Sequence, residues 1–517
     1  MLDENWLQTF TEAHFGVTVS VQPHGMEILL TPDRLLKAVG DLKAEWVLAG
    51  VMAEEDRDRG MRMRYLFYGH EKPWLALLVK TPGTPLPSIS KTFFAADWQE
   101  REIEDLFDIR FEGHPQLGNF VLHNEDWPEK TAPMRQHPPE APLQNPQWED
   151  VKLSAIVEAP GAFVMPIGPV YSGVSESVQF NLETVGEEII FAHIRPFYKY
   201  RAAEKVMEGK NPQEAMLVAE RIDGLAAFAH SLAFCQAVEQ AQLVPVPPKV
   251  RLLRIFWAEF ERIRAHVGTL AAIIESTGLG VPANLMLALE EELLQLSAIY
   301  TGHRYLFGLN RLGGLSLTWR EEEIRAVTEK TGSVVNEALE IAQALIFDNS
   351  FMDRLEFVGI LSLTLANTYG LVGPVGRASG RGRDLRQWQP YSGYEQMTFH
   401  SPVQTEGDGY ARFRQFGQEI AQSLALLQQI PGSPPKGPAP PFGCQLQNTA
   451  LGYCEGPAGA IIYALRMDEG GRVRQCRIIT PSMINWHAFP QAVRHFTFQD
   501  FPIILATFGL SVAELDR

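Results

Sequence analysis

The spacing of hydrophobic residues divides the chain into a short mixed region and a long helical one. Residues 75–79 form a continuous apolar run that is typical of a buried strand, and residues 61–68 alternate in part, which predicts a neighbouring strand. The acidic, amphipathic segment 97–108 is predicted to be a helix. Residues 1 to about 150 therefore predict an α+β arrangement.

A helical period dominates from about residue 200 to about residue 430. The pattern starts around Ile222 and Leu232 and predicts four longer helices, at 249–276, 283–308, 321–347 and 404–429. Shorter β elements flank this region. They are two strands around a turn at Gly186 (178–182 and 189–192) and a hairpin at 460–480, followed by a short final helix.

Two proline-rich stretches, 128–146 and 431–441, interrupt these patterns and predict extended connections.

Composition narrows the classes of function. The formal net charge of −17 argues against nucleic-acid binding. The four cysteines lie at least ten residues apart, so no C-x-x-C ligand pair exists, and we predict no metal site in this chain. No run of 18 apolar residues and no signal peptide is present, so any membrane role would go through partner subunits.

One candidate for chemistry is Asp223, on a predicted helix over 221–231. Ala226 and His230 follow at distances of three and seven residues, which places all three on one helix face. Asp223 is then either a proton-handling carboxylate that lines a cavity or an aspartate hydrogen-bonded within a helical core, and the residues alone leave both readings open.

A second candidate is the arginine-rich segment that begins at 373–382. Five of those ten residues are glycine or proline, which predicts a tight loop and not a helix. Its charges indicate an internal ion-pair network or an anion contact, with a solvated basic loop as the alternative: Arg377, Arg381, Arg383, Asp384 and Arg386. On the predicted helix 249–276, Glu261 and Arg264 are spaced to pair with each other.

Several motifs together resemble a known pair of subunits. Residues 97–102, 105–107 and 111–115 resemble the signature W-x-E-R-E-x-x-D-x-F-G-I-x-F-x-G-H-P of the complex I 30 kDa subunit. Further positions resemble the 49 kDa subunit: 204–205, 221, 228–231, 261–262, 266, 373–374, 377, 379–380, 384–386 and 390–391. The chain thus resembles a fusion of the 30 kDa and 49 kDa subunits of respiratory complex I, a fusion shared with group 4 membrane-bound NiFe-hydrogenase large subunits of the formate hydrogenlyase type.

The resemblance implies three parts. Residues 1–125 would form a 30 kDa-type α/β domain, 126–158 a proline-rich linker, and 159–517 a mostly α-helical domain of the hydrogenase large-subunit type with small β elements at both ends.

The metal-binding frames of the hydrogenases carry no cysteine in this chain. In R-I-C-G-x-C the cysteine positions are Asp223 and Ala226, and in D-P-C-x-x-C they are Ser511 and Glu514. Nickel and iron of this kind need thiolates, so hydrogenase activity becomes the least favoured alternative.

The departures from complex I are also informative. The tyrosine that binds the quinone headgroup in complex I aligns with Gly224, and the histidine of its N-terminal hairpin aligns near Tyr171 or Ser172. Glu176 corresponds to a loop acid of the hydrogenases. The chain therefore matches neither the complex I subunits nor the hydrogenase large subunits at all of these positions.

By resemblance, we expect an oxidoreductase subunit, related to NADH dehydrogenases, that is active only within a complex. It would pass electrons from a neighbouring iron–sulfur subunit to a quinone and couple this to ion translocation, while binding no cofactor itself. Asp223, His230 and Glu176 would handle protons, and Asp384, Arg386 and Glu514 would carry the charge change. Tyr171, Gly224, Ala226 and Ser511 would contact the quinone.

The expected partners are an iron–sulfur small subunit of the complex I 20 kDa type, a ferredoxin-like subunit, and antiporter-like and quinone-channel-type membrane subunits. The chain would lie at the cytoplasmic face of the membrane. A second hypothesis is a non-redox structural subunit that joins a soluble module to a membrane ion pump.

Overall fold

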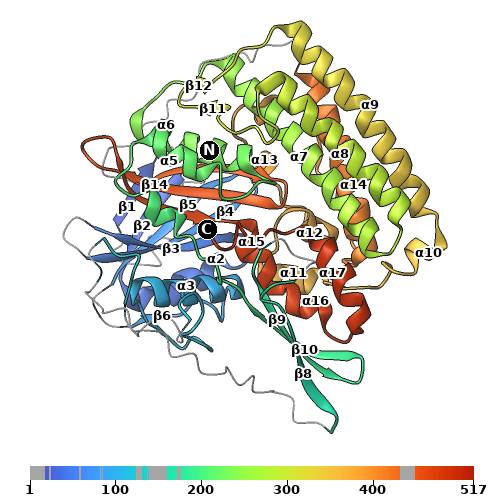
Figure 1. Cartoon of the computed structure of the whole chain (residues 1–517). Coiled ribbons are helices and arrows are strands. Elements are labelled where there is room, and N and C mark those ends of the chain that lie inside the picture. The colour runs from blue at the N-terminus through green and yellow to red at the C-terminus, as the bar shows by residue number, and fades with distance from the viewer. Residues whose placement is uncertain are drawn as a thin grey trace.

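The computed structural model describes residues 18–22, 25–56, 60–81, 83, 85–123, 131–136, 138, 160–171, 176–430 and 449–517 (Figure 1). Most of the predicted linker at 126–158, the proline-rich stretch 431–441, Ser172 and Cys444 lie outside the described residues. The predicted α+β class is confirmed, with a mixed N-terminal region and a largely helical region after it.

The N-terminal region is built on a five-stranded sheet in the order β1-β2-β5-β4-β3. All neighbours are antiparallel except β2 and β5. The predicted neighbours are confirmed, since Met63 pairs with Val79 and Phe67 with Leu75. The strands are β1 Thr18–Gln22, β2 Gly25–Leu30, β3 Val47–Glu55, β4 Met61–Gly69 and β5 Lys72–Lys80.

The alternation along β4 serves two cores. Tyr65 and Phe67 point to one face and pack with α2 (Leu35–Leu42) and α3 (Asp97–Phe107), the helix predicted at 97–108. Leu66 and Tyr68 point to the other face and join the core of the C-terminal sheet. Because side chains alternate across a strand, one sheet is buried on both sides.

The C-terminal sheet consists of β13 Ala450–Gly456, β14 Gly459–Met467 and β15 Val473–Ile479 in antiparallel order, which confirms the predicted hairpin at 460–480. Helix α6 (Ala227–Gln242) packs across β13 and β14. Figure 1 shows this sheet between the N-terminal sheet and the helices.

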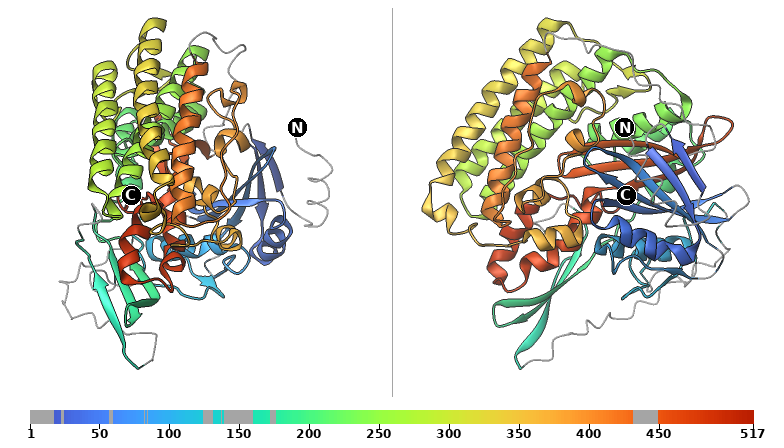
Figure 2. Two further views of the ribbon diagram at one scale, coloured as in Figure 1. Left: turned by 90° about the vertical axis from the view of Figure 1, so that its right-hand side faces the viewer. Right: turned by 180° about the vertical axis from the view of Figure 1, so that it is seen from behind.

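Four long helices form a bundle in the ring order α7, α8, α9 and α14, and α7 also touches α9 across the ring (Figure 2). They are α7 Pro248–Ser276, α8 Gly280–Thr301, α9 Glu321–Ile346 and α14 Gly409–Gln429. In the described part of the chain, no helix combines the length and the apolar character needed to cross a membrane.

Two bundle helices differ from their predicted bounds. Helix α8 ends at Thr301 and not near 308, because Gly302 takes a left-handed φ of 83°. Helix α14 begins at Gly409 and not at 404, where the Asp408 side chain accepts a hydrogen bond from Ala411 N.

The segment 373–382 is partly helical, so the prediction of a loop without helix was wrong. Helix α12 covers Gly373–Ala378, with a proline in its first turn. Proline is favoured there because its missing N–H has no partner to lose, so proline content alone did not exclude a helix. Other short helices are α10 Asn349–Met352, α11 Leu363–Tyr369 and α13 Leu385–Trp388.

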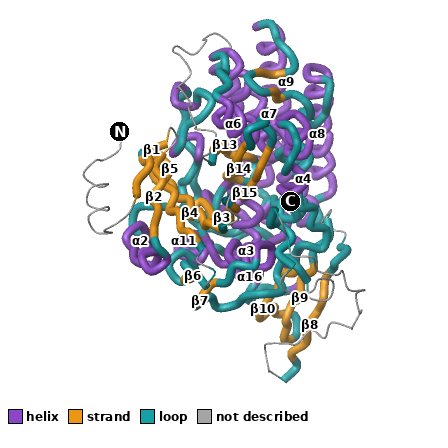
Figure 3. The backbone as a smooth tube through the Cα atoms, turned by 90° about the vertical axis from the view of Figure 1, so that its left-hand side faces the viewer, coloured by secondary structure: helices purple, strands orange, loops and turns teal. Residues whose placement is uncertain are grey.

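A three-stranded antiparallel sheet, in the order β10-β9-β8, extends from the body of the molecule (Figure 3). The predicted strands around Gly186 are confirmed as β9 Gln179–Val185 and β10 Glu188–Arg195, and β8 is Ala162–Ile167.

The remaining elements are short and lie in the connections. They are β6 Leu86–Pro87, β7 Phe111–Glu112, α4 Ala203–Met207, α5 Pro212–Ala219, β11 Asn310–Arg311, β12 Gly314–Leu315, α15 Pro481–Asn485, α16 Phe489–Val493 and α17 Phe501–Phe508.

The last residues run back into the interior. Leu515 is fully buried, and Arg517 Nη2 lies 3.1 Å from Glu102 Oε2 on α3. The C-terminal segment is thereby packed against the N-terminal region (Figure 1).

Candidate functional site

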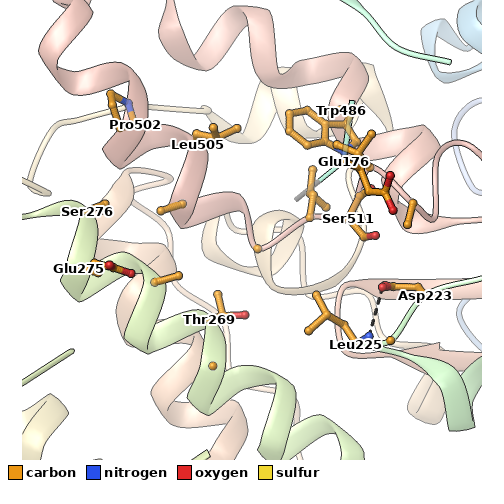
Figure 4. Close-up of a pocket in the computed structure, with 18 of the residues that line it drawn as sticks. Glu176, Asp223, Leu225, Thr269, Glu275, Ser276, Trp486, Pro502, Leu505 and Ser511 are labelled. Atoms are coloured by element: carbon orange, nitrogen blue, oxygen red, sulfur yellow. Dashed lines mark hydrogen bonds between the residues drawn. The ribbon is translucent and has the colours of Figure 1, made fainter. Parts of the chain in front are cut away.

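A cavity of about 740 Å³ lies where α7, α17, the loop before α6 and the C-terminal segment meet. Figure 4 shows Asp223, Ser511 and Glu176 at one end and Glu275 and Ser276 of α7 at the other. A cavity of this size is within the usual range for small-molecule sites.

The wall of the cavity combines acidic and apolar side chains. Four carboxylates line it, and none of its described lining residues is lysine or arginine: Asp223, Glu176, Glu275 and Glu290. Leu505 and Pro502 of α17 supply apolar surface, together with Trp486. Trp486 Nε1 donates to Ser511 O at 3.2 Å, which holds the C-terminal segment in the wall. The cavity can therefore hold an apolar ring next to carboxyl groups.

Asp223 lies on a loop and not on a helix, so the predicted helix over 221–231 was wrong in its first half. Helix α6 begins only at Ala227. The Asp223 carboxylate accepts a hydrogen bond from Leu225 N at 3.2 Å, a local turn that competes with helix formation (Figure 4). As a result, Asp223 and His230 do not share a helix face.

The surroundings of Asp223 favour its neutral form. Burial raises its pKa, and the negative charge of Glu514 raises it further, to about 6. The Leu225 hydrogen bond, His230 and a hydrogen bond with Ser511 act in the opposite direction. Asp223 can therefore exchange a proton close to neutral pH, which supports the reading of this residue as a cavity carboxylate over that of a purely structural aspartate.

His230 is fully buried behind the cavity and is not one of its lining residues. Its Nδ1 lies 3.0 Å from the Tyr463 hydroxyl and its Nε2 lies 3.3 Å from Glu514 Oε1. Glu514 also accepts a hydrogen bond from Ser482 N at 3.2 Å. His230 thus acts on Asp223 through charge and through Glu514.

The fold brings the two metal-frame segments together. Asp223, Ala226 and Ser511 line one narrow pocket that adjoins the cavity, and Glu514 influences the Asp223 carboxyl. The groups at the four frame positions are two carboxylates, a methyl and a hydroxyl, which do not suit soft nickel and iron. Within the described ranges, no group of three or more His, Cys, Asp or Glu side chains is arranged to hold a metal ion.

The other predicted quinone contacts are partly in place. Tyr171 and Gly224 both line the cavity. Glu176 lines it as well and forms ion pairs with Lys199 (3.4 Å) and Arg201 (2.8 Å). Ser172 lies outside the described residues.

Arg377, Asp384 and Arg386 of the arginine-rich segment form a buried ion-pair network, so the alternative of a solvated loop was wrong. Arg381 instead donates to the carbonyls of Ala366 and Leu371, and Arg383 lies over the Trp388 ring. Arg386 lies 2.7 Å from Asp384 and 3.0 Å from Glu259. Arg377 lies 2.8 Å from Glu419 and 2.8 Å from Glu455. Neither Asp384 nor Arg386 is among the residues that line the cavity.

The network keeps most of its charges fixed. Burial favours neutral Asp384, but Arg386 and Arg377 outweigh it and lower the pKa of Asp384. Glu455 differs, because burial and the nearby Asp384 raise its pKa. Near neutral pH, most of the network would respond to charge by polarisation and not by titration.

One histidine connects the network to the narrow pocket. His266 lines that pocket beside Asp223 and Ser511. Its Nε2 lies 3.3 Å from Glu419 Oε2, and Glu419 binds Arg377. Polar contacts therefore lead from His266, in the wall of the Asp223 pocket, through Glu419 to Arg377.

Several relevant residues were missed from the sequence. Glu290 lies in a run of three glutamates on α8, which is typical of a solvated helix face. Glu275 and Leu505 belong to none of the sequence motifs described above. Glu259 and Glu419 sit on long helices, and only the observation that a buried arginine needs a carboxylate could have indicated them.

Three protein families match successive parts of this chain. "Respiratory-chain NADH dehydrogenase, 30 Kd subunit" matches residues 28–142. "Nickel-dependent hydrogenase" matches residues 201–268, and "Respiratory-chain NADH dehydrogenase, 49 Kd subunit" matches residues 277–441 and 443–517. The resemblance found in the motifs is thereby confirmed: the chain carries a complex I 30 kDa-type region followed by a 49 kDa-type and hydrogenase-type region.

Individual relatives agree. The chain is 26% identical over 454 residues to formate hydrogenlyase subunit 5 of Escherichia coli, covering 86% of this chain and 80% of that protein. It is 28% identical over 479 residues to the C/D subunit of NADH-quinone oxidoreductase of Methylococcus capsulatus, covering 84% and 81%. It is 29% identical over 366 residues to the D 2 subunit of NADH-quinone oxidoreductase of Solibacter usitatus, covering 68% and 97%.

Proposed function

We propose that this chain is the large subunit of a complex I-related oxidoreductase and reduces a quinone-type acceptor in the cavity beside Asp223. Electrons would come from an iron–sulfur cluster of a neighbouring subunit. The observation that carries the proposal is a single cavity in which a carboxylate with a pKa of about 6 lies near an apolar wall. The relatives support it by name, since two of them are NADH-quinone oxidoreductase subunits.

Quinone reduction needs a source of protons and a binding site for the quinone ring. Reduction of a quinone to a quinol takes up two electrons and two protons, so a protonated acid next to the ring lowers the barrier. Asp223 would give one proton and Glu176, at the same end, could relay another. Tyr171 provides a phenol in the wall, although Gly224 has no side chain to offer.

The buried network would transmit the resulting charge change. When Asp223 loses its proton, the new negative charge acts on the narrow pocket, on His266 and then on Glu419 and Arg377. Asp384 and Arg386 continue the network. Membrane-arm partners of the antiporter-like and quinone-channel types would receive this effect, with the chain held at the cytoplasmic face of the membrane by its partners.

A NiFe centre is not part of the proposal. Ala226 offers no donor atom, and Glu514 is bound to Ser482 and His230. The chain itself would hold no cofactor, and the iron–sulfur clusters would belong to the small and ferredoxin-like subunits.

The proposal is tested by replacing Asp223 with Asn in the assembled complex. The variant keeps size and hydrogen bonding but cannot titrate, so donor-to-quinone turnover should fall at least about tenfold. Asp353→Asn is a matched control, because Asp353 is exposed and distant in sequence from the cavity residues. Parental turnover of an assembled Asp223→Asn complex would contradict the proposal.

A non-redox structural role is the second candidate, and one observation favours it. Gly224 occupies the position of the complex I quinone tyrosine and adds no hydroxyl to the wall. In that case the chain would only connect a soluble module to a membrane ion pump. Both Asp223→Asn and His230→Ala would then assemble and turn over at the parental rate.

A further inference from the structure

Two neighbouring side chains of α7 contact opposite ends of the loop that carries Asp223. The Glu261 carboxylate accepts hydrogen bonds from Phe228 N at 2.7 Å and from Ala229 N at 2.9 Å. These are first-turn amides of α6, which have no partner within the helix. Glu261 therefore anchors the end of the loop where α6 begins.

Arg264, three residues further along α7, holds the other part of the loop. Its Nη2 donates to Gly224 O at 3.1 Å and to Leu225 O at 2.8 Å. The two carbonyls directly follow Asp223 in sequence, so this contact restricts the direction of the Asp223 side chain. Glu261 and Arg264, which are spaced to pair with each other, both direct their hydrogen bonds to the loop.

Arg264 is itself held from the cavity side. Its Nη1 lies 3.7 Å from Glu290 Oε1, and its guanidinium lies 5.2 Å from the Tyr305 ring. Gly268 makes room for Glu290, because a Cβ at that position would lie only 2.8 Å from the Glu290 carboxylate. Glu290 and Gly268 both line the cavity. The cavity wall is thus connected through Arg264 to the backbone of the Asp223 loop.

We infer that Glu261 and Arg264 are positioning residues that fix residues 223–229 so that the Asp223 carboxyl stays buried at the cavity wall, and that Glu290 orients Arg264. Together, Glu261 and Arg264 form a clamp on this loop. The relevance of the clamp to catalysis rests on the proposed function, but its effect on Asp223 does not. The clamp is built from side chains that are nearly inaccessible, since Glu261 is 2% and Arg264 is 3% exposed.

The clamp should control the protonation of Asp223 by keeping water away from it. The charged and titratable groups near Asp223 are Glu514 from the C-terminal segment, His230 from α6, Glu261 and His266 from α7, and Glu176 at the same end of the cavity. Burial is the largest influence on the pKa of Asp223. When the loop loosens, water reaches the carboxylate, and its pKa should move down toward the usual value of 3.8.

The test measures the protonation of Asp223 without measuring turnover. Dicyclohexylcarbodiimide, an apolar carbodiimide, reacts with protonated carboxyl groups. Labelling of the full-length chain with its natural partners between pH 4 and pH 9 then gives a midpoint for Asp223. The tryptic peptide 222–249 contains only one other acid, Glu239, so peptide fragmentation locates the label. Asp223→Asn is the control that shows the labelling of this peptide in the absence of the Asp223 carboxyl.

The expected midpoint is about 6 in the parental chain. In Arg264→Gln and in Glu261→Asp it should be lower by at least about one pH unit. Glu261→Asp keeps the carboxyl group, whose pKa burial raises to about 7 in the parental chain, but it is too short to reach both amides. If only the presence of a carboxyl group mattered, the midpoint would therefore not change. Arg264→Lys can still donate to both carbonyls, and its midpoint should stay within about 0.3 pH unit of the parental one.

Arg325→Gln is the matched control, because it removes an exposed arginine that pairs with Glu321 on α9. If an assembled Arg264→Gln or Glu261→Asp protein shows the parental midpoint, the inference that these residues position Asp223 is overturned. If one of the two variants fails to assemble, the midpoint of the other variant decides. A lowered midpoint together with parental turnover of Asp223→Asn would keep the clamp and reject the proposed redox function.

Discussion

His230 Nε2 lies 3.3 Å from Glu514 Oε1, although the two residues are 284 positions apart in the sequence. Both are buried, and the other ring nitrogen of His230 lies 3.0 Å from the Tyr463 hydroxyl. The imidazole therefore joins α6, the C-terminal sheet and the last segment of the chain in one place. Since Glu514 also raises the pKa of Asp223, the contact between His230 and Glu514 influences the protonation of Asp223 although His230 does not line the cavity.

His230→Ala should slow donor-to-quinone turnover less than Asp223→Asn does, by roughly threefold to tenfold. The reason is that His230 acts through Glu514 and not on the acceptor itself. Steady-state turnover of the purified complex measures the effect. A larger loss than in Asp223→Asn would assign the direct proton transfer to His230.

Asp223→Asn should stabilise the folded protein above neutral pH. The folded pKa of about 6 lies above the usual 3.8, so the stability associated with the neutral acid is present below pH 3.8 and is lost as the pH rises through about 6. Burying the charged form costs up to about 3 kcal/mol, and asparagine avoids that cost.

Thermal unfolding of both proteins between pH 5 and pH 8 gives the comparison. The advantage of Asp223→Asn should grow up to about pH 6.5 and then remain constant. Asp353→Asn, at an exposed position, should show no such dependence. A difference in melting temperature that is independent of pH would show that Asp223 has an ordinary pKa.

Arg386→Met should destabilise the protein strongly. The substitution leaves Asp384 and Glu259 buried without their shared cation, and breaking a buried pair costs about 3–5 kcal/mol. Arg325→Met, which removes an exposed arginine, should cost less than about 1 kcal/mol. Equilibrium unfolding in urea measures both, and similar values for the two variants would refute the structural importance of the network.

The purified chain should contain no stoichiometric nickel. Asp223, Ala226, Ser511 and Glu514 supply no thiolate, and soft metal centres depend on thiolates. Elemental analysis by mass spectrometry of the purified chain gives the ratio directly. About one nickel per chain would require a site elsewhere and would return the hydrogenase hypothesis to consideration.

Local patterns were sufficient for many elements. The strands at 61–68 and 75–79, the acidic helix at 97–108 and the four bundle helices were predictable because burial on a regular element imposes a period on the sequence. The motifs also indicated the family, and the absence of cysteine from the two metal frames could be read directly.

Tertiary structure decided how the candidate residues are used. Asp223 is on a loop because its own side chain and the α7 residues Glu261 and Arg264 satisfy backbone groups that a helix would otherwise satisfy. Those partners are 30 to 40 residues away, so no local period could reveal them. Likewise, the charges of Arg377 and Arg386 are buried and not solvated because carboxylates on two distant helices, Glu259 and Glu419, reach them. Periodicity records which side of an element is buried, whereas the partner of a buried polar group depends on which elements meet in space.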